Sequence, residues 1–205
     1  LTDAIAEIRQ AIQRDPNTPL LWTQLAVWLS APGVHEEALA AAKKAVEIEP
    51  SDIPAHLTLA DLYRGQKRFA EAEAELETAI TLSPDSPEPY FILARYHAEQ
   101  RAFEKARAVL LRLTRRTPSS GQAYFLLGRV AIETQSWEEA VAALKRATEL
   151  DPDHDGAWTA LGYVYETRHQ DEDALQTYRR AISANPDNPA FIERLSDLLI
   201  RQGKF

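Results

Sequence analysis

The chain has 205 residues, of which 45% are hydrophobic and 26% are charged, and its formal net charge is −8 at pH 7. This balance is typical of a folded chain, and the acidic net charge argues against nucleic acid as a partner. No apolar stretch is long enough to span a bilayer, which argues against direct membrane insertion of this segment, and the absence of cysteine excludes disulfides, thiol catalysis and cysteine-bound zinc.

Evenly spaced prolines divide the chain. Six of them follow one another at intervals of 34 residues: Pro16, Pro50, Pro84, Pro118, Pro152 and Pro186. Proline ends a helix because it lacks an N–H group and its ring clashes with the preceding turn. The Ser, Asp and Asn residues that follow these frame prolines can cap the next helix by accepting hydrogen bonds from its first amides. One helix is therefore predicted to end, and another to begin, in every interval.

In chain order, the predicted elements are a lone second helix near residues 2–14, five complete helix pairs, and a lone first helix near residues 190–202. The expected boundaries are a half-unit 1–18, full units 19–52, 53–86, 87–120, 121–154 and 155–188, and a half-unit 189–205, together forming one array. We expect a segment of a longer array, because arrays usually end in polar caps. Apolar residues crowd the last helix instead, namely Phe191, Leu195, Leu198, Leu199 and Ile200. This end either pairs with another copy or simply exposes some apolar surface.

Each unit repeats a pattern of large and small residues. When the third residue after each frame proline is counted as position 1, position 7 is always Leu, position 20 is always Ala, and position 8 is Ala, Gly or Ser. Large residues at positions 4, 7 and 11 lie on one face of a helix. Small residues at positions 8, 20 and 27 allow two helices to approach closely. An isolated pair cannot bury these faces, so neighbouring pairs are expected to stack.

The 34-residue period and the Trp/Tyr–Leu–Gly/Ala…Ala…Ala…Pro pattern resemble the tetratricopeptide repeat, of a bacterial multi-repeat type, over essentially the whole chain. The resemblance implies an all-α fold, a right-handed α-solenoid of stacked antiparallel helix pairs, with a concave groove lined mainly by first helices. Local departures are His97 and Ala131 in place of the usual tyrosine, the large Trp28 where a small residue is common, and Arg116 at a usually apolar place.

A search for chemistry-bearing motifs favours structural explanations. The stretch DPDHDG at 151–156 is similar to the start of a calcium loop, but the twelfth position, which needs a bidentate Glu, is Gly162. An inter-repeat turn with capping carboxylates is the preferred interpretation. The histidines have no ligand spacing, and His56 occupies the Trp/Tyr packing position. We therefore expect no enzyme activity, no cofactor and no metal site.

The groove positions carry a repeated motif that the fold does not require. YFILAR at 90–95 recurs as YFLLGR at 124–129, so Phe and Arg return at positions 5 and 9. The predicted partner-binding residues form an apolar strip with two arginines beside it: Leu57, Phe91, Arg95, Phe125, Arg129 and Tyr163. Such a surface suits an extended or helical peptide with apolar anchors and a carboxylate. Alternatively, Arg95–Glu99 and Arg129–Glu133 are surface ion pairs and the phenylalanines belong to the core.

Three functions remain open. The first is a non-catalytic scaffold that binds a protein or peptide in its concave groove. The second is a regulatory or targeting arm of a larger enzyme or of a secretion or export assembly. The third is a self-assembling module that forms homo-oligomers through its uncapped ends. The compartment also stays open, since the bacterial cytoplasm, the periplasm and an association with the outer membrane all fit the sequence.

Overall fold

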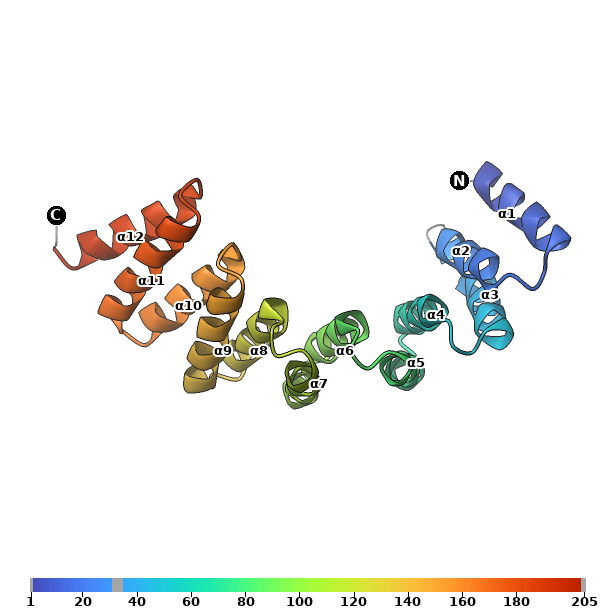
Figure 1. Ribbon diagram of the computed structural model, residues 1–205, viewed down its shortest axis with the longest axis horizontal. Helices are drawn as coiled ribbons and strands as arrows, with labels where there is room; N and C mark the ends of the chain where they lie inside the picture. The colour runs from blue at the N-terminus through green and yellow to red at the C-terminus, as the bar shows by residue number, and fades with distance from the viewer. Residues whose placement is uncertain (1, 31–34, 204–205) are drawn as a thin grey trace. The chain divides into compact units, whose positions relative to one another are not determined.

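The structure is a computed structural model that describes residues 2–30 and 35–203. Within these ranges the chain forms helices and no strand, which confirms the predicted all-α repeat fold. The helices are α1 (Thr2–Arg14), α2 (Pro19–Ser30), α3 (His35–Ile48), α4 (Ile53–Gly65), α5 (Phe69–Leu82), α6 (Pro87–Glu99), α7 (Phe103–Arg116), α8 (Gly121–Glu133), α9 (Trp137–Leu150), α10 (Asp155–Thr167), α11 (Asp171–Ala184) and α12 (Pro189–Arg201) (Figure 1).

The helices divide into two compact units, residues 1–93 and 94–205, with the boundary inside α6. In the N-terminal unit α2 packs on α3, α4 packs on α5, and α2 and α3 both contact α4. In the C-terminal unit α8 packs on α9 and α10 packs on α11, while α9 contacts α10 and α12 covers α11. Within each unit, first helices thus pair with second helices and neighbouring pairs stack. That the whole chain forms a single array remains a prediction.

Two glycines at position 8 bring first and second helices close together. A Cβ atom added to Gly128 on α8 would lie 2.5 Å from Cγ of Leu144 on α9. A Cβ atom added to Gly162 on α10 would lie 2.4 Å from Cζ of Tyr178 on α11. Both distances are too short for real contacts, so the close approach depends on glycine. The prediction that small residues at this position permit tight pairing is confirmed.

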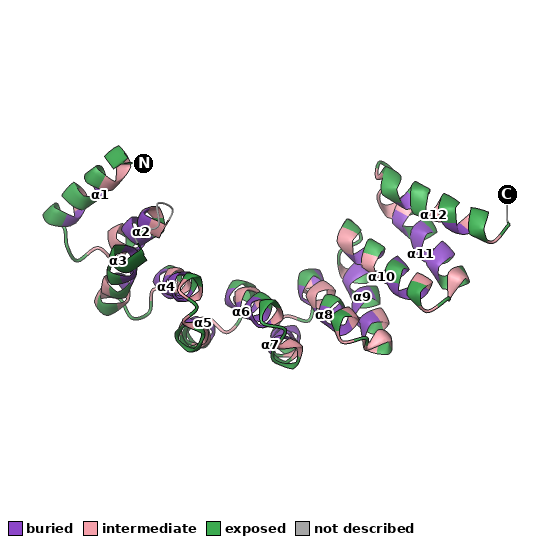
Figure 2. Cartoon of the chain, turned by 180° about the vertical axis from the view of Figure 1, so that it is seen from behind, coloured by how far each residue is buried: buried purple, intermediate pink, exposed green. Residues whose placement is uncertain are grey.

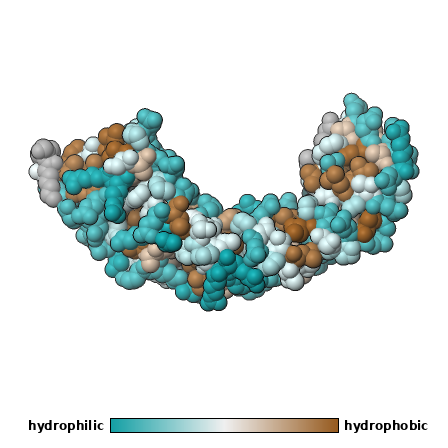
Figure 3. All heavy atoms as spheres, in the orientation of Figure 1, coloured by the Kyte–Doolittle hydropathy of each residue, from teal (hydrophilic) through white to brown (hydrophobic). Residues whose placement is uncertain are grey.

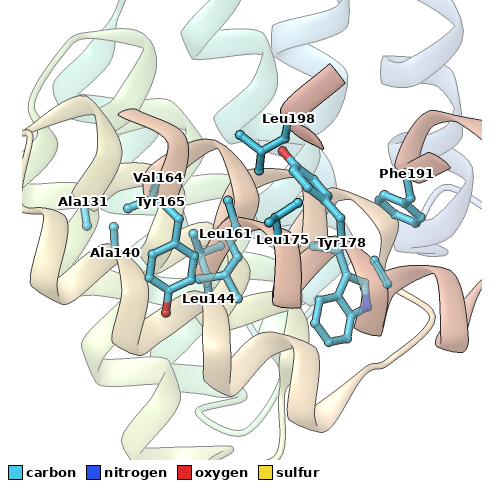
Figure 4. Packing of buried hydrophobic residues seen from close by; sticks show 13 residues of the cluster. Ala131, Ala140, Leu144, Leu161, Val164, Tyr165, Leu175, Tyr178, Phe191 and Leu198 are labelled. Carbon is cyan, nitrogen blue, oxygen red and sulfur yellow. The ribbon is translucent and has the colours of Figure 1, made fainter. Parts of the chain in front are cut away.

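The buried core of the C-terminal unit lies between its helices. Leu161, Tyr178 and Leu198 are almost fully buried in one cluster that joins residues of α8 to α12. Figure 4 shows Phe191 and Leu198 of α12 beside Tyr178 of α11. Purple, buried positions face neighbouring helices in Figure 2, and the outer faces are green.

The apolar residues of α12 are less exposed than the sequence suggested. Phe191 and Leu198 are buried against α11, and Leu195 and Leu199 pack against the same cluster. Only Ile192 and Ile200 stay exposed among the large hydrophobic residues of α12, at 48% and 59%. Hydrophobic atoms gather around α12 in Figure 3. One face of α12 thus completes the core of its own unit, and the exposed Ile192 and Ile200 agree with the alternative that this end exposes some apolar surface.

The capping prediction holds at some helix starts and fails at others. Ser120 accepts a hydrogen bond from the amide of Ala123, and Asn188 accepts one from the amide of Ala190. Asp52, at the start of α4, makes no side-chain cap. A polar residue after the proline is therefore not sufficient, because its side chain must also point at a free amide.

A residue with positive φ follows each of the first helices α4, α6, α8, α10 and α12, which the sequence did not reveal. These residues stand at position 15, with φ between 55° and 67°: Lys67, Arg101, Gln135, His169 and Gly203. In the α8–α9 turn, the amide of Ser136 donates to the carbonyl of Ala131 at 2.8 Å and the amide of Gln135 donates to Ile132 at 3.0 Å. This pair of bonds is the Schellman motif, which normally favours glycine at its left-handed position.

Position 4 has a role beyond packing. Its ring nitrogen or hydroxyl bonds to the carbonyl of the frame proline that precedes it, at 2.8 Å for Trp22 and Trp158 and 3.0 Å for Tyr90. Buried His56 does the same through Nε2, 3.0 Å from the carbonyl oxygen of Pro50, and its Nδ1 lies 2.6 Å from Glu75. These residues tie each first helix to the turn before it, so the Trp/Tyr preference selects a donor as well as a large ring.

None of the described helices combines the length and the apolar character that a crossing of the membrane requires.

Candidate partner-binding groove

The C-terminal unit contains an open groove of about 680 Å³ along its first helices. Most of its lining comes from α8 and α10, one side chain from α11 reaches it, and Arg194 of α12 adds a charged group. This volume lies within the range of about 300–1,000 Å³ that is usual for ligand-binding pockets. The groove brings together three predicted site residues, Phe125, Arg129 and Tyr163.

The apolar surface of the groove consists of three aromatic rings, those of Phe125, Tyr163 and Tyr178, and smaller aliphatic groups. Phe125 is half-buried and packs against the core cluster, so it is both a core residue and a groove residue. Tyr163 is 51% exposed, which is high for a large aromatic side chain. Ile132 and Ala160 lie between the helices and line the same groove. The alternative that the phenylalanines belong to the core is thus correct in part for Phe125, whereas the Tyr163 side chain is exposed.

Arg129 presents an unneutralised guanidinium to the groove. Its Cζ atom lies 5.9 Å from the centre of the Phe125 ring, within the range of a cation–π contact. In the part of the chain that the structure describes, Arg129 forms no ion pair, so the alternative of a surface pair between Arg129 and Glu133 is not formed. Arg95 differs, since its Nε lies 4.0 Å from Oε1 of Glu99 on the same helix.

Arg194 is a second groove arginine, and sequence reasoning missed it. It is exposed on α12, and within the described residues it has no ion-pair partner. It stands at position 6 of its unit, whereas the predicted groove residues all stand at positions 5 and 9. No other unit has an arginine at this position, so no repeated pattern pointed to Arg194.

Glu166 contributes a carboxylate to the groove, but both of its oxygens are engaged. The Tyr178 hydroxyl donates to Oε1 at 2.6 Å, and Arg201 forms an ion pair with Oε2. Burial raises the pKa of the Tyr178 hydroxyl well above its usual range, and the hydrogen bond to Glu166 acts in the same direction. The hydrogen bond to Glu166 also raises the pKa of the Arg201 guanidinium. Together these bonds fix α10 to α11 and α12.

The DPDHDG stretch forms the turn before α10 and borders the groove. His154 accepts a hydrogen bond from the amide of Ala157, so the cap is a histidine and not the expected carboxylate. The His154 ring lies 4.3 Å from the Phe125 ring, centre to centre. Asp155 accepts hydrogen bonds from Asn185 at 2.8 Å and Asn188 at 2.7 Å, which join consecutive turns. Nowhere among the described residues do three or more His, Cys, Asp or Glu side chains come together so that they could hold a metal ion.

The other predicted site residues lie outside this groove. Leu57 on α4 and Phe91 on α6 belong to the N-terminal unit, and both are half-buried. Arg95 is exposed on α6 and belongs to the C-terminal unit. That these three residues contact a partner remains a prediction.

Comparison with known proteins agrees with this architecture. Family models described as tetratricopeptide repeat match residues 29–80, 57–121, 93–155 and 125–189. No curated protein sequence matches the chain significantly.

Solved structures share the fold at low sequence identity. The crystal structure of YrrB, described as a TPR protein with an unusual peptide-binding site, is 23% identical, with a TM-score of 0.62 and coverage of 97% of this chain and 98% of that one. A MamA crystal structure is 20% identical, with a TM-score of 0.67 over 83% of this chain and 93% of that chain. PilF of Pseudomonas aeruginosa is 19% identical, with a TM-score of 0.66 over 98% and 87%. The chain belongs to the tetratricopeptide repeat family.

Proposed function

We propose that the C-terminal unit binds a segment of a partner protein in the groove of Phe125, Arg129 and Tyr163. The family consists of helical scaffolds for protein–protein interaction, and this groove supplies the chemistry that such a scaffold needs. The observation that carries the proposal is that exposed Tyr163 lines the same groove as Arg129, which has no ion-pair partner among the described residues.

Tyrosine and arginine suit this task for physical reasons. Both types are enriched among the residues that dominate binding energies at protein interfaces. Tyr163 offers a large ring with few rotatable bonds, so ordering it on binding has a small entropic penalty. Arg129 can bind a carboxylate through two parallel hydrogen bonds. Its contact with Phe125 orients the guanidinium before a ligand arrives.

The likeness to YrrB supports a peptide as the ligand. That protein is described as having an unusual peptide-binding site, and the two chains cover each other almost completely. At 23% identity the likeness extends to the fold and not to individual residues.

The test uses the whole chain and a displayed pool of random peptides of about twelve residues. Peptides retained by the wild-type chain are expected to bind Tyr163→Ala and Arg129→Ala at least about tenfold more weakly, as truncation of an interface hot spot commonly does. Arg180→Ala is the matched control, because Arg180 is exposed on α11 and does not line the groove. Equal binding by all four proteins, or no retained peptide, would refute the proposed function.

Two other functions remain predictions. A role as the regulatory or targeting arm of a larger enzyme or export assembly is compatible with the same groove. Self-association is compatible with exposed Ile192 and Ile200, and light scattering across a concentration series tests it. A strictly monomeric result counts against self-association.

A further inference from the structure

We infer that the segment bound in this groove is acidic on both sides of an apolar anchor, with one carboxylate held by Arg129 and the other by Arg194. The inference rests on the proposed function and specifies the class of ligand. It starts from two arginines on different first helices, α8 and α12, that line one groove and lack ion-pair partners among the described residues.

The charge of the groove favours an acidic ligand although the chain is acidic overall. Four charged side chains line it, namely Arg129, Arg194, Glu133 and Glu166. Glu166 is neutralised by its ion pair with Arg201 and accepts the Tyr178 hydroxyl, so it offers no free carboxylate oxygen. Glu133 is exposed at the end of α8 and is the remaining negative group among the lining residues. The groove is therefore locally positive in a chain of net charge −8.

The apolar anchor is placed by the same geometry. Tyr163 is exposed on α10, which is the first helix of the unit between the units that begin with α8 and α12. A segment that crosses these first helices meets Arg129, then Tyr163, and then Arg194. The order of contacts along the ligand is accordingly acidic, apolar and acidic.

The spacing of the acidic residues follows from helix packing. α8 contacts α10 directly, and packed helices lie about 8–10 Å apart. Taking a step of the same size from α10 to α12 gives roughly 16–20 Å in total. An extended chain advances about 3.3 Å per residue, so this distance corresponds to about five or six residues. Long arginine side chains tolerate a change of about one residue. We expect two Glu or Asp residues about four to seven positions apart, with Leu, Phe or Tyr between them.

The test measures which peptide sequences the chain prefers, and not only whether it binds peptides. The whole chain selects from the pool of random peptides, and the retained sequences are aligned on their apolar anchor. Enrichment of two acidic positions at the stated spacing is expected. Arg194→Gln should abolish enrichment at one of these positions and Arg129→Gln at the other, whereas Arg180→Gln should leave both. In one retained peptide, each of the two acidic residues is then replaced by its amide, one at a time. Each replacement should weaken binding to the wild-type chain about tenfold. It should hardly change binding to the variant that lacks the arginine proposed to bind that acidic residue.

Each outcome separates the two proposals. Retained peptides with an apolar anchor but no acidic preference would overturn the inference and leave the proposed function standing. An acidic preference that survives in both groove variants would also overturn the inference, because another surface would then read the charge. If the wild-type chain retains no peptide, the proposed function fails and the inference fails with it.

Discussion

The replacement Gly162→Ala tests whether helix spacing depends on the small residue at position 8. The new methyl carbon would lie 2.4 Å from Cζ and 2.5 Å from the hydroxyl oxygen of Tyr178. Tyr178 cannot simply move away, because it is almost fully buried and its hydroxyl is bonded to Glu166. Either α10 and α11 separate or the ring leaves its hydrogen bond.

Two opposing terms decide the size of the effect. Alanine is about 1 kcal/mol better than glycine inside a helix, which favours the variant. Overpacking a well-filled core destabilises by about 1–3 kcal/mol, and loss of the Tyr178–Glu166 hydrogen bond adds about 1 kcal/mol. The sum is a net destabilisation of about 1–3 kcal/mol. Gly65→Ala is the matched control, because Gly65 ends α4 with no atom within 4 Å of the added carbon. There only the favourable helix term applies.

Hydrogen exchange of the α10 and α11 amides is the suitable assay, since it reports local stability in a chain of two units. Gly162→Ala should speed their exchange, and adding Tyr178→Leu should restore protection. The double variant places Ala opposite Leu, the combination already present at Ala60 and Leu76 in the N-terminal unit. If the α10 amides exchange as slowly in Gly162→Ala as in the wild-type chain, close packing at this position does not constrain the helix pair.

Three further predictions concern the turns and the buried tyrosine. Gln135→Gly should raise the free energy of unfolding of the α8–α9 pair by about 0.5–1 kcal/mol, because glycine adopts the left-handed conformation at φ 56° without strain. This gain outweighs the larger conformational entropy that glycine gives the unfolded chain. Unchanged hydrogen exchange of the α9 amides would contradict this prediction. Asp155→Ala removes the carboxylate that accepts hydrogen bonds from Asn185 and Asn188, so the free energy of unfolding of the C-terminal unit in urea should fall by about 1–2 kcal/mol. Asp155→Asn should give a smaller decrease. Equal decreases for both variants would argue against a contribution from the carboxylate hydrogen bonds. Because the pKa of Tyr178 is raised in the folded state, the folded chain keeps a proton that the unfolded chain releases from about pH 10 upward. The stability that this group contributes is therefore complete below pH 10 and declines above it. Tyr178→Phe should make the decline of stability at alkaline pH less steep, and an unchanged pH profile would show that Tyr178 does not cause this decline.

The repeat architecture was predictable because several independent requirements repeat at the same interval. Proline fixes where helices end, and alanine at position 20 and leucine at position 7 fix which faces are buried. The left-handed conformation at position 15 was not predictable, because Lys67, Arg101 and Gln135 are not residues that usually mark such a conformation. The tertiary fold imposes it there, since the Schellman hydrogen bonds compensate for the strain.

The candidate site was predictable only where it repeats. Phe125 and Arg129 stood out because they copy residues of the preceding unit, and Tyr163 because it occupies the same groove position as Arg129. Arg194 has no counterpart in other units, so no spacing signalled it. The neutralisation of Glu166 depends on Tyr178 and Arg201, which come from two other helices. A sequence pattern along one helix cannot reveal such a three-helix arrangement.

Variation at the groove positions follows from the way the fold uses its first helices. Position 4 bonds to the frame proline in several units and position 8 meets the second helix, so both are restricted to few residue types. Position 9 faces away from these contacts and holds Val27, Asp61, Arg95, Arg129, Tyr163 and Asp197, which differ in size, polarity and charge. Tyr163 and Val27 are both exposed there, although burial would suit them better. Packing therefore does not restrict position 9, which leaves this position free to carry the partner contact proposed for Tyr163.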